Sequence, residues 1–258
     1  MDITAGSSPP PGEPVEVAGR RIDWTPRDVV LGIMAFLGAF LLVPLIPFVI
    51  LLVIFDDDES RGFLLSATAL NILVYGVIIA VAAYFTFGKY GGGWSRLGFG
   101  RPRWPTLWWG LAAFAGAYLA SVAWGLFVQL FESLEQSCDD QVPLYIRDDP
   151  VVLAALGLSA IVFAPVAEET FFRGFLFPGI ARFAGVAAGV VLSGVLFGLA
   201  HLVGNPTLWK SAAQFSLIGI VFALAYWKSG NLLSVVLAHM LFNTLGVIAI
   251  VAVECEPS

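Results

Sequence analysis

Six polar side chains interrupt the apolar runs of the C-terminal 110 residues, and their types suit acid–base chemistry. They are Glu168, Glu169, Arg173, His201, His239 and Asn243. The two histidines are the only ones in the chain. An ionisable side chain at the centre of a bilayer costs on the order of 2.5–3.5 kcal/mol by insertion scales, so such groups mark functional sites by default. We therefore take these six residues as the candidate site.

The spacing of the first three residues separates the two glutamates. On a helix, which turns about 100° per residue, Glu169 and Arg173 lie on one face and are placed to form an i,i+4 ion pair. Glu168 points about 100° away from Glu169. The pattern predicts that Arg173 neutralises Glu169 while the Glu168 carboxylate stays free.

Two further pairs repeat the four-residue spacing. His239 and Asn243 share one face of a helix, and so do Phe197 and His201. If the chain reverses near Gly185, Glu168 lies 17 residues before the turn and His201 lies 16 after it. At 1.5 Å per residue, both then lie roughly 25 Å from the turn, at the same level.

This set of groups favours hydrolysis. Glu168 could act as general base on a water molecule, which His201 at the same depth could hold or polarise. His239 and Asn243 could donate hydrogen bonds to the oxyanion that forms when the water attacks a peptide carbonyl.

Other chemistry stays open. Glu168, His201 and His239 form a His₂Glu set, the ligand type of catalytic zinc, although the HExxH spacing of common zinc proteases is absent. The same residues are compatible with an ion or proton pathway, with polar contacts that only hold helices together, and with a non-proteolytic membrane protein of binding, immunity or scaffold type. No basic tract indicates nucleic-acid binding.

The elements that position these residues are membrane helices. Hydrophobic residues make up 59% of the 258 residues and charged residues 12%, against about 45–50% and 25% in soluble proteins. Apolar runs of about 20 residues span a bilayer as helices. Seven such spans are expected: Val29–Phe55, Phe63–Gly88, Thr106–Phe131, Val151–Arg182, Phe183–Trp209, Ser211–Trp227 and Gly230–Val253. An eighth, re-entrant or half-span element could lie in the first 60 residues.

The distribution of lysine and arginine orients this all-α, polytopic transmembrane bundle. With the N-terminus in the cytoplasm, nine of the 13 basic residues lie inside, as the positive-inside rule requires. They are Arg20, Arg21, Arg27, Lys89, Arg96, Arg101, Arg103, Arg182 and Lys228. We expect a disordered cytoplasmic tail (1–28), three N-terminal helices with loops (29–150), a catalytic unit of four helices (151–253) and a short tail (254–258).

Two smaller features concern association. Cys138 and Cys255 both fall on the outer side, where they form a disulfide or remain two unpaired thiols. Gly185 and Gly189 form a GxxxG pair, which lets helices approach closely. We favour packing within the bundle over a homodimer face.

Three motifs together resemble a known family. The stretch from Glu168 to Arg173 resembles an EExxxR motif, the stretch from Phe197 to His201 an FxxxH motif, and the stretch from His239 to Asn243 an HxxxN motif. Their order, each on its own apolar run, is similar to the CPBP family of intramembrane proteases. This family includes CAAX-type prenyl endopeptidases and bacteriocin-processing or self-immunity proteins. The resemblance covers about 151–253.

The resemblance implies an endopeptidase whose site lies inside the membrane and opens toward the cytoplasm. It implies Glu168 as the general base, His201 on the catalytic water, and His239 and Asn243 as the oxyanion hole, with Glu169 and Arg173 in support. It leaves a metalloprotease and a metal-free glutamate mechanism open. It implies a membrane-anchored substrate, prenylated or not, and we expect the plasma membrane of a prokaryote.

Overall fold

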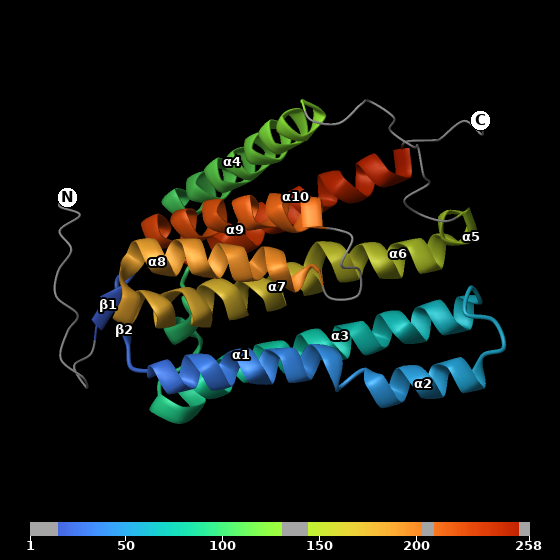
Figure 1. Ribbon diagram of the computed structural model, residues 1–258, viewed down its shortest axis with the longest axis horizontal. Coiled ribbons are helices and arrows are strands. Elements are labelled where there is room, and N and C mark those ends of the chain that lie inside the picture. The colour runs from blue at the N-terminus through green and yellow to red at the C-terminus, as the bar shows by residue number, and fades with distance from the viewer. Residues whose placement is uncertain (1–14, 131–143, 203–208, 253–258) are drawn as a thin grey trace.

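The computed structural model describes residues 15–130, 144–202 and 209–252, which form a bundle of roughly aligned helices with one small hairpin (Figure 1). The long helices are α1 (Pro26–Leu41), α3 (Arg61–Ala83), α4 (Trp104–Gln129), α8 (Phe177–Ala200), α9 (Trp209–Ser229) and α10 (Leu232–Ala252). The shorter α-helices are α2 (Leu45–Ile54), α5 (Leu144–Arg147), α6 (Pro150–Leu158) and α7 (Ala164–Glu169). Three π-helical segments, η1 (Tyr84–Gly88), η3 (Ser159–Phe163) and η4 (Thr170–Leu176), and a 3₁₀ turn, η2 (Trp94–Leu97), complete the helical elements.

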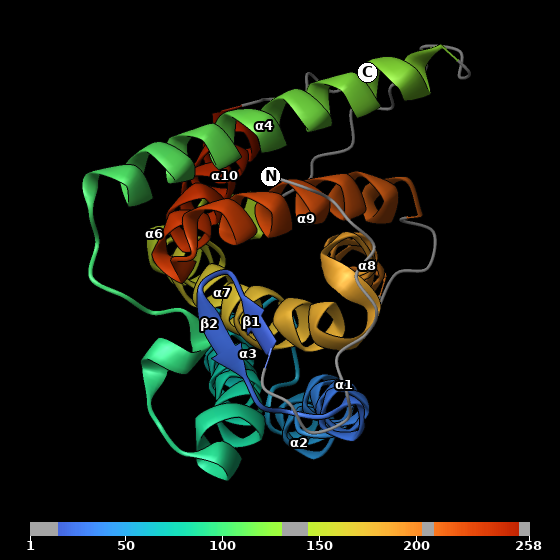
Figure 2. The ribbon, with the colours of Figure 1, turned by 90° about the vertical axis from the view of Figure 1, so that its left-hand side faces the viewer.

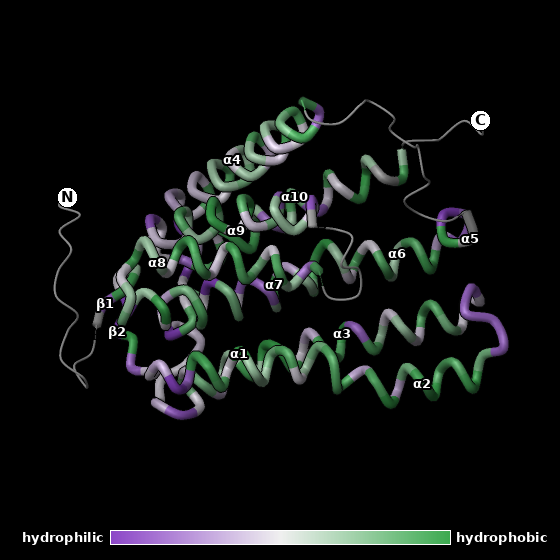
Figure 3. Tube along the Cα trace, viewed as in Figure 1, coloured by the Kyte–Doolittle hydropathy of each residue, from purple (hydrophilic) through white to green (hydrophobic). Residues whose placement is uncertain are grey.

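Six helical segments in the described part of the chain are long and apolar enough to cross a membrane. They are Pro26–Ile54, Arg61–Gly88, Trp104–Gln129, Pro150–Ala200, Lys210–Ser229 and Leu232–Ala249. Hydrophobic residues fill the length of these helices, while hydrophilic residues gather at the two ends of the bundle (Figure 3). The protein is therefore an all-α polytopic membrane protein, as its composition predicts.

The fourth of these segments is a hairpin. Gly185 has a φ of 84° and a ψ of 160°, which break the helix, and glycine adopts this conformation without strain. Beyond the break, a Cβ placed on Gly189 would lie 3.0 Å from the carbonyl oxygen of Phe177, 12 residues earlier. Such an approach requires two antiparallel arms. The seven predicted spans correspond to the six segments with the fourth divided at Gly185; the number of membrane crossings stays a prediction.

Residues 15–28 differ from the disordered tail expected over 1–28. Strands β1 (Val15–Val17) and β2 (Arg20–Ile22) pair antiparallel across a turn at Ala18 and Gly19, both with positive φ. Val17 and Ile22 are buried, and the buried Trp24 donates a hydrogen bond from Nε1 to the carbonyl oxygen of Phe175 (3.1 Å). These apolar side chains order a segment whose overall polarity suggests a tail. Residues 1–14 lie outside the described residues.

The hairpin lies across one end of the helices (Figure 2). The same end carries the nine basic residues predicted to face the cytoplasm, and two acidic side chains anchor some of them. Asp28 accepts a hydrogen bond from Lys89 Nζ, and Asp23 is paired with Arg96. Burial alone would raise the pKa of Asp23, but hydrogen bonds from Arg96 and Arg21 outweigh it and hold that pKa below its usual range. This end is thus a compact polar cap on the bundle.

Small residues bring α8 and α9 together. A Cβ on Gly194 would lie 2.7 Å from the backbone nitrogen of Ile220, and Gly198 is equally close to α9. Gly189 packs against the first arm of its own hairpin, as the packing expected within the bundle requires, and the homodimer considered for Gly185 and Gly189 stays untested. Cys138 and Cys255 lie outside the described residues, and their pairing stays untested.

The α8–α9 contact gives a first prediction. Gly194→Ala should lower the free energy of unfolding by about 1–3 kcal/mol, because the added methyl group meets backbone atoms of Gly219 and Ile220 as well as the Ile220 side chain. Thermal unfolding in a single detergent, followed by circular dichroism, measures this change.

Gly125→Ala in α4 is the matched control, because no atom lies within 4 Å of the added methyl group. It should be neutral or slightly stabilising, since alanine favours a helix more than glycine does. Equal losses in both variants would contradict the close packing of α8 on α9.

Candidate active site

Helix α7 presents the two glutamates between two π-helical segments. η3 precedes the six-residue α7 and η4 follows it, so a single continuous helical arm changes its hydrogen-bond register on both sides of Glu168 and Glu169. Such π-helical turns occur frequently at functional sites, because each one inserts a residue and re-aims the side chains around it.

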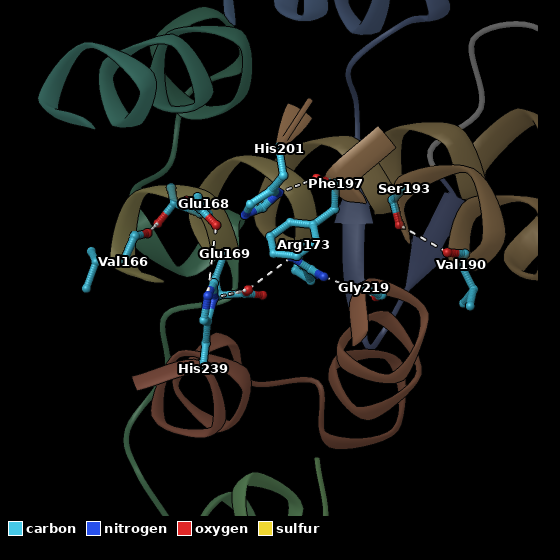
Figure 4. A network of polar contacts seen from close by, with 11 residues as sticks. Val166, Glu168, Glu169, Arg173, Val190, Ser193, Phe197, His201, Gly219 and His239 are labelled. Atoms are coloured by element: carbon cyan, nitrogen blue, oxygen red, sulfur yellow. Dashed lines mark hydrogen bonds and ion pairs between the residues drawn. The ribbon is translucent and has the colours of Figure 1, made fainter. Parts of the chain in front are cut away.

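Arg173 and Glu169 are fully buried polar groups of the site. Arg173 Nη1 donates a hydrogen bond to Glu169 Oε1 (3.0 Å), and Arg173 Nη2 donates one to the carbonyl oxygen of Gly219 on α9 (3.1 Å). The predicted i,i+4 pair is therefore present. Glu169 Oε1 also accepts a hydrogen bond from His239 Nδ1 (2.8 Å), a contact that the spacing did not predict (Figure 4).

Aromatic rings surround the arginine. Its guanidinium carbon lies 4.4 Å from the ring centre of Phe197, 5.5 Å from that of Phe222 and 5.9 Å from that of Phe172. Cation–π attraction is strongest where water is excluded, so these rings compensate part of the cost of burying the charge. Phe197, the first residue of the FxxxH motif, is thus a direct contact of Arg173.

Glu168 lies outside this ion pair, as its angle on the helix predicts. Its side chain is 18% exposed, and its Oε2 has no hydrogen-bond partner among the described residues. His239 Nε2 lies 3.9 Å from this oxygen. The two adjacent carboxylates therefore differ: Glu169 Oε1 accepts hydrogen bonds from Arg173 and His239, whereas Glu168 lines the cavity and its Oε2 has no donor among the described residues.

The partners of the two histidines define their tautomers. His201 Nδ1 lies 2.8 Å from the carbonyl oxygen of Phe197, and His239 Nδ1 lies 2.8 Å from the Glu169 carboxylate. Both partners can only accept, so each Nδ1 carries the proton and each neutral ring has an unprotonated Nε2. The Nε2 of each histidine is thus left to act as an acceptor.

A cavity of about 180 Å³ joins the predicted residues. It is lined by Glu168, Phe197, His201, Phe215, Ile218, His239, Phe242 and Asn243. Asn243 Nδ2 donates to the carbonyl oxygen of Ala160 in η3 (2.7 Å), which leaves the second N–H of this amide available. The structure thus brings together the four residues proposed from the sequence as catalytic, and Glu169 and Arg173 lie directly behind them.

Several contacts of the site come from residues that the sequence analysis did not select. Phe215 stacks on His201 with ring centres 4.2 Å apart, and Phe222 lies against His239 at 5.4 Å. Both belong to α9, which contributes no titratable side chain to the site. Single aromatic residues in an apolar run carry no signal that distinguishes lining of a site from ordinary packing.

The use of zinc by Glu168, His201 and His239, considered from the sequence, stays a prediction. No group of three or more His, Cys, Asp or Glu side chains within 15–130, 144–202 and 209–252 is arranged to hold a metal ion. We derive no step through zinc from Glu168, His201 and His239 as they are placed here.

The buried ion pair gives a second prediction, which distinguishes the contributions of Glu169 and Glu168 to stability. Arg173→Met should lower the free energy of unfolding by about 3–5 kcal/mol, because it leaves the Glu169 carboxylate buried without a countercharge. Glu168→Gln should change it by about 0.5 kcal/mol or less, since Glu168 has no hydrogen-bonded partner to lose. Thermal unfolding of both variants in the same detergent tests this contrast, and similar losses would refute it.

Comparisons with known proteins match the part of the chain that contains this site. Residues 150–245 match the family model described as type II CAAX prenyl endopeptidase Rce1-like. An uncharacterized 24.3 kDa protein of Escherichia coli is 34% identical over 101 residues, which are 38% of this chain and 45% of that protein. The match thus spans less than half the length of this relative, and no solved structure matches the chain. The matched segment contains every residue of the cavity, so the part of the chain that forms the site is similar to the CAAX-type intramembrane proteases of the CPBP family.

Proposed function

We propose that the protein is an intramembrane endopeptidase in which Glu168 activates water to cleave a membrane-associated protein or peptide. The observation that carries this proposal is the free Glu168 oxygen in a cavity that also contains the two histidines and Asn243. A carboxylate without a partner in a site largely closed to water is placed to take a proton from a bound water molecule.

The Nε2 atom of His201 supports the same step. A water molecule that gives one proton to Glu168 can donate its other hydrogen to His201 Nε2, which orients the oxygen lone pair toward a peptide carbonyl. Attack then forms the new C–O bond and places a negative charge on the carbonyl oxygen. The proton held by Glu168 passes to the leaving nitrogen as the C–N bond breaks.

Asn243 and His239 would stabilise the oxyanion. The free N–H of Asn243 is a donor as it stands, because its other N–H is held by the Ala160 carbonyl. His239 donates from Nε2 only when its ring carries both protons. In that form, two carboxylates face one guanidinium and one imidazolium, so the charges of the site balance.

The substrate class and location are part of the proposal. The family model is described by its action on CAAX prenyl proteins, so a peptide ending in a farnesylated CAAX sequence is the first probe. The end of the bundle that carries the hairpin and the nine basic residues would face the cytoplasm of a prokaryotic plasma membrane.

The proposal predicts that Glu168→Gln slows cleavage strongly. Loss of a general base lowers kcat by about 10²- to 10⁴-fold, while glutamine keeps the shape of the side chain. Purified parent and variant would be incubated with farnesylated CAAX peptides and with other membrane-anchored peptides, with and without a zinc chelator, and the products identified by mass spectrometry. Equal cleavage by both proteins would exclude Glu168 as the base.

Asn243→Ala should lower kcat by about 10²- to 10³-fold with little change in KM, because an oxyanion donor acts mainly in the transition state. Thr244→Ala is the matched control, since the Thr244 hydroxyl donates only to Met240 within the same helix and does not line the cavity. A rise in KM at unchanged kcat for Asn243→Ala would assign this residue to substrate binding instead.

A further inference from the structure

Two polar side chains lie at the middle of α3, in a membrane segment without charged residues between its ends. The candidate span covers Arg61–Gly88, and Asn71 and Tyr75 lie near its centre. Asn71 is exposed and Tyr75 is half-buried at the edge of the core. Asn71 Nδ2 donates a hydrogen bond to the Tyr75 hydroxyl oxygen (3.3 Å).

This hydrogen bond leaves most of the donors and acceptors of Asn71 and Tyr75 without a partner. The Tyr75 O–H, the second N–H of Asn71 and Asn71 Oδ1 have no further partner in the part of the chain that the structure describes. Two donors and one acceptor therefore remain at the depth of the hydrocarbon. Because lipid cannot satisfy polar groups, an exposed set of this kind at mid-bilayer indicates a polar ligand.

The pair lies on the Glu168 side of α3. Helix α3 packs against α7, and Tyr75 is within electrostatic range of the Glu168 carboxylate. Figures 1 and 2 show α3 on the opposite side of α7 from α10, which carries His239 and Asn243. A substrate segment beside Glu168 would thus have oxyanion donors on one side and the α3 pair on the other.

The peptide backbone of a substrate has the polar groups that Asn71 and Tyr75 could bind. In a helical substrate, every peptide carbonyl is hydrogen-bonded within the helix and shielded by its turns. Cleavage therefore needs an unwound segment, whose free N–H and C=O groups lipid cannot satisfy. Asn71 offers both a donor and an acceptor, the complement of one peptide unit, and Tyr75 offers a second donor.

We propose that Asn71 and Tyr75 bind the backbone of the unwound substrate segment next to Glu168. This inference rests on the proposed peptidase function and adds a substrate-binding surface from the N-terminal half of the chain. It gives α3, outside the matched family segment, a defined part in the reaction.

A kinetic test uses whichever membrane-anchored peptide the parent protein cleaves best. Tyr75→Phe and Asn71→Leu should each raise KM by about three- to tenfold, the range for one hydrogen bond between uncharged groups, with kcat within about twofold. Asn71→Gln should recover part of the loss. Tyr118→Phe is the control, because Tyr118 is 51% exposed at the middle of α4 and its substitution removes the same hydroxyl group. Unchanged KM values, or an equal rise in the control, would overturn the proposal.

A second measurement separates this inference from the peptidase function. The photoreactive residue p-benzoylphenylalanine would replace Tyr75, or Tyr118 as control, in the Glu168→Gln protein, which would then be irradiated with the same peptides. Peptide adducts at position 75 and not at position 118 support the binding surface, even if the parent cleaves no peptide and the proposed function fails. Absence of adducts at position 75, or equal adducts at both positions, overturns it whether or not the parent is active.

Discussion

A buried positive charge organises the centre of this bundle. Arg173 has no exposed surface, and such a charge is tolerated only with a countercharge and further hydrogen bonds. Glu169 supplies the countercharge, and the Gly219 carbonyl accepts a further hydrogen bond from Arg173. Three phenylalanine rings surround the guanidinium group. These partners come from the hairpin arms and from α9. The single ion pair therefore ties together elements that the chain order separates.

The same interaction separates the roles of two neighbouring carboxylates. Glu169 is engaged by Arg173 and His239, and it holds the imidazole ring in one orientation. Glu168, one residue earlier, points to the cavity and keeps an oxygen without a partner. Burying two glutamates in a membrane costs free energy. The ion pair with Arg173 offsets this cost for Glu169, and the Glu168 carboxylate remains available for chemistry.

Two backbone irregularities position parts of the site. The positive φ at Gly185 reverses the chain and brings His201 back to the level of Glu168. The π-helical η3 places the Ala160 carbonyl where it orients the Asn243 amide. Within the membrane, such deviations persist only where side chains satisfy the displaced polar groups, and Asn243 does so here.

The all-helical membrane fold, the approximate spans and the candidate site follow from the sequence, because hydropathy and four-residue spacing are local properties of a helix. The Glu169–Arg173 pair and the free Glu168 follow from the same periodicity. The Glu169–His239 contact, the stacking of Phe215 on His201 and the ordered hairpin at 15–22 depend on which helices pack together. Such contacts between distant segments leave no periodic signal in a single sequence, and only the tertiary structure decides them.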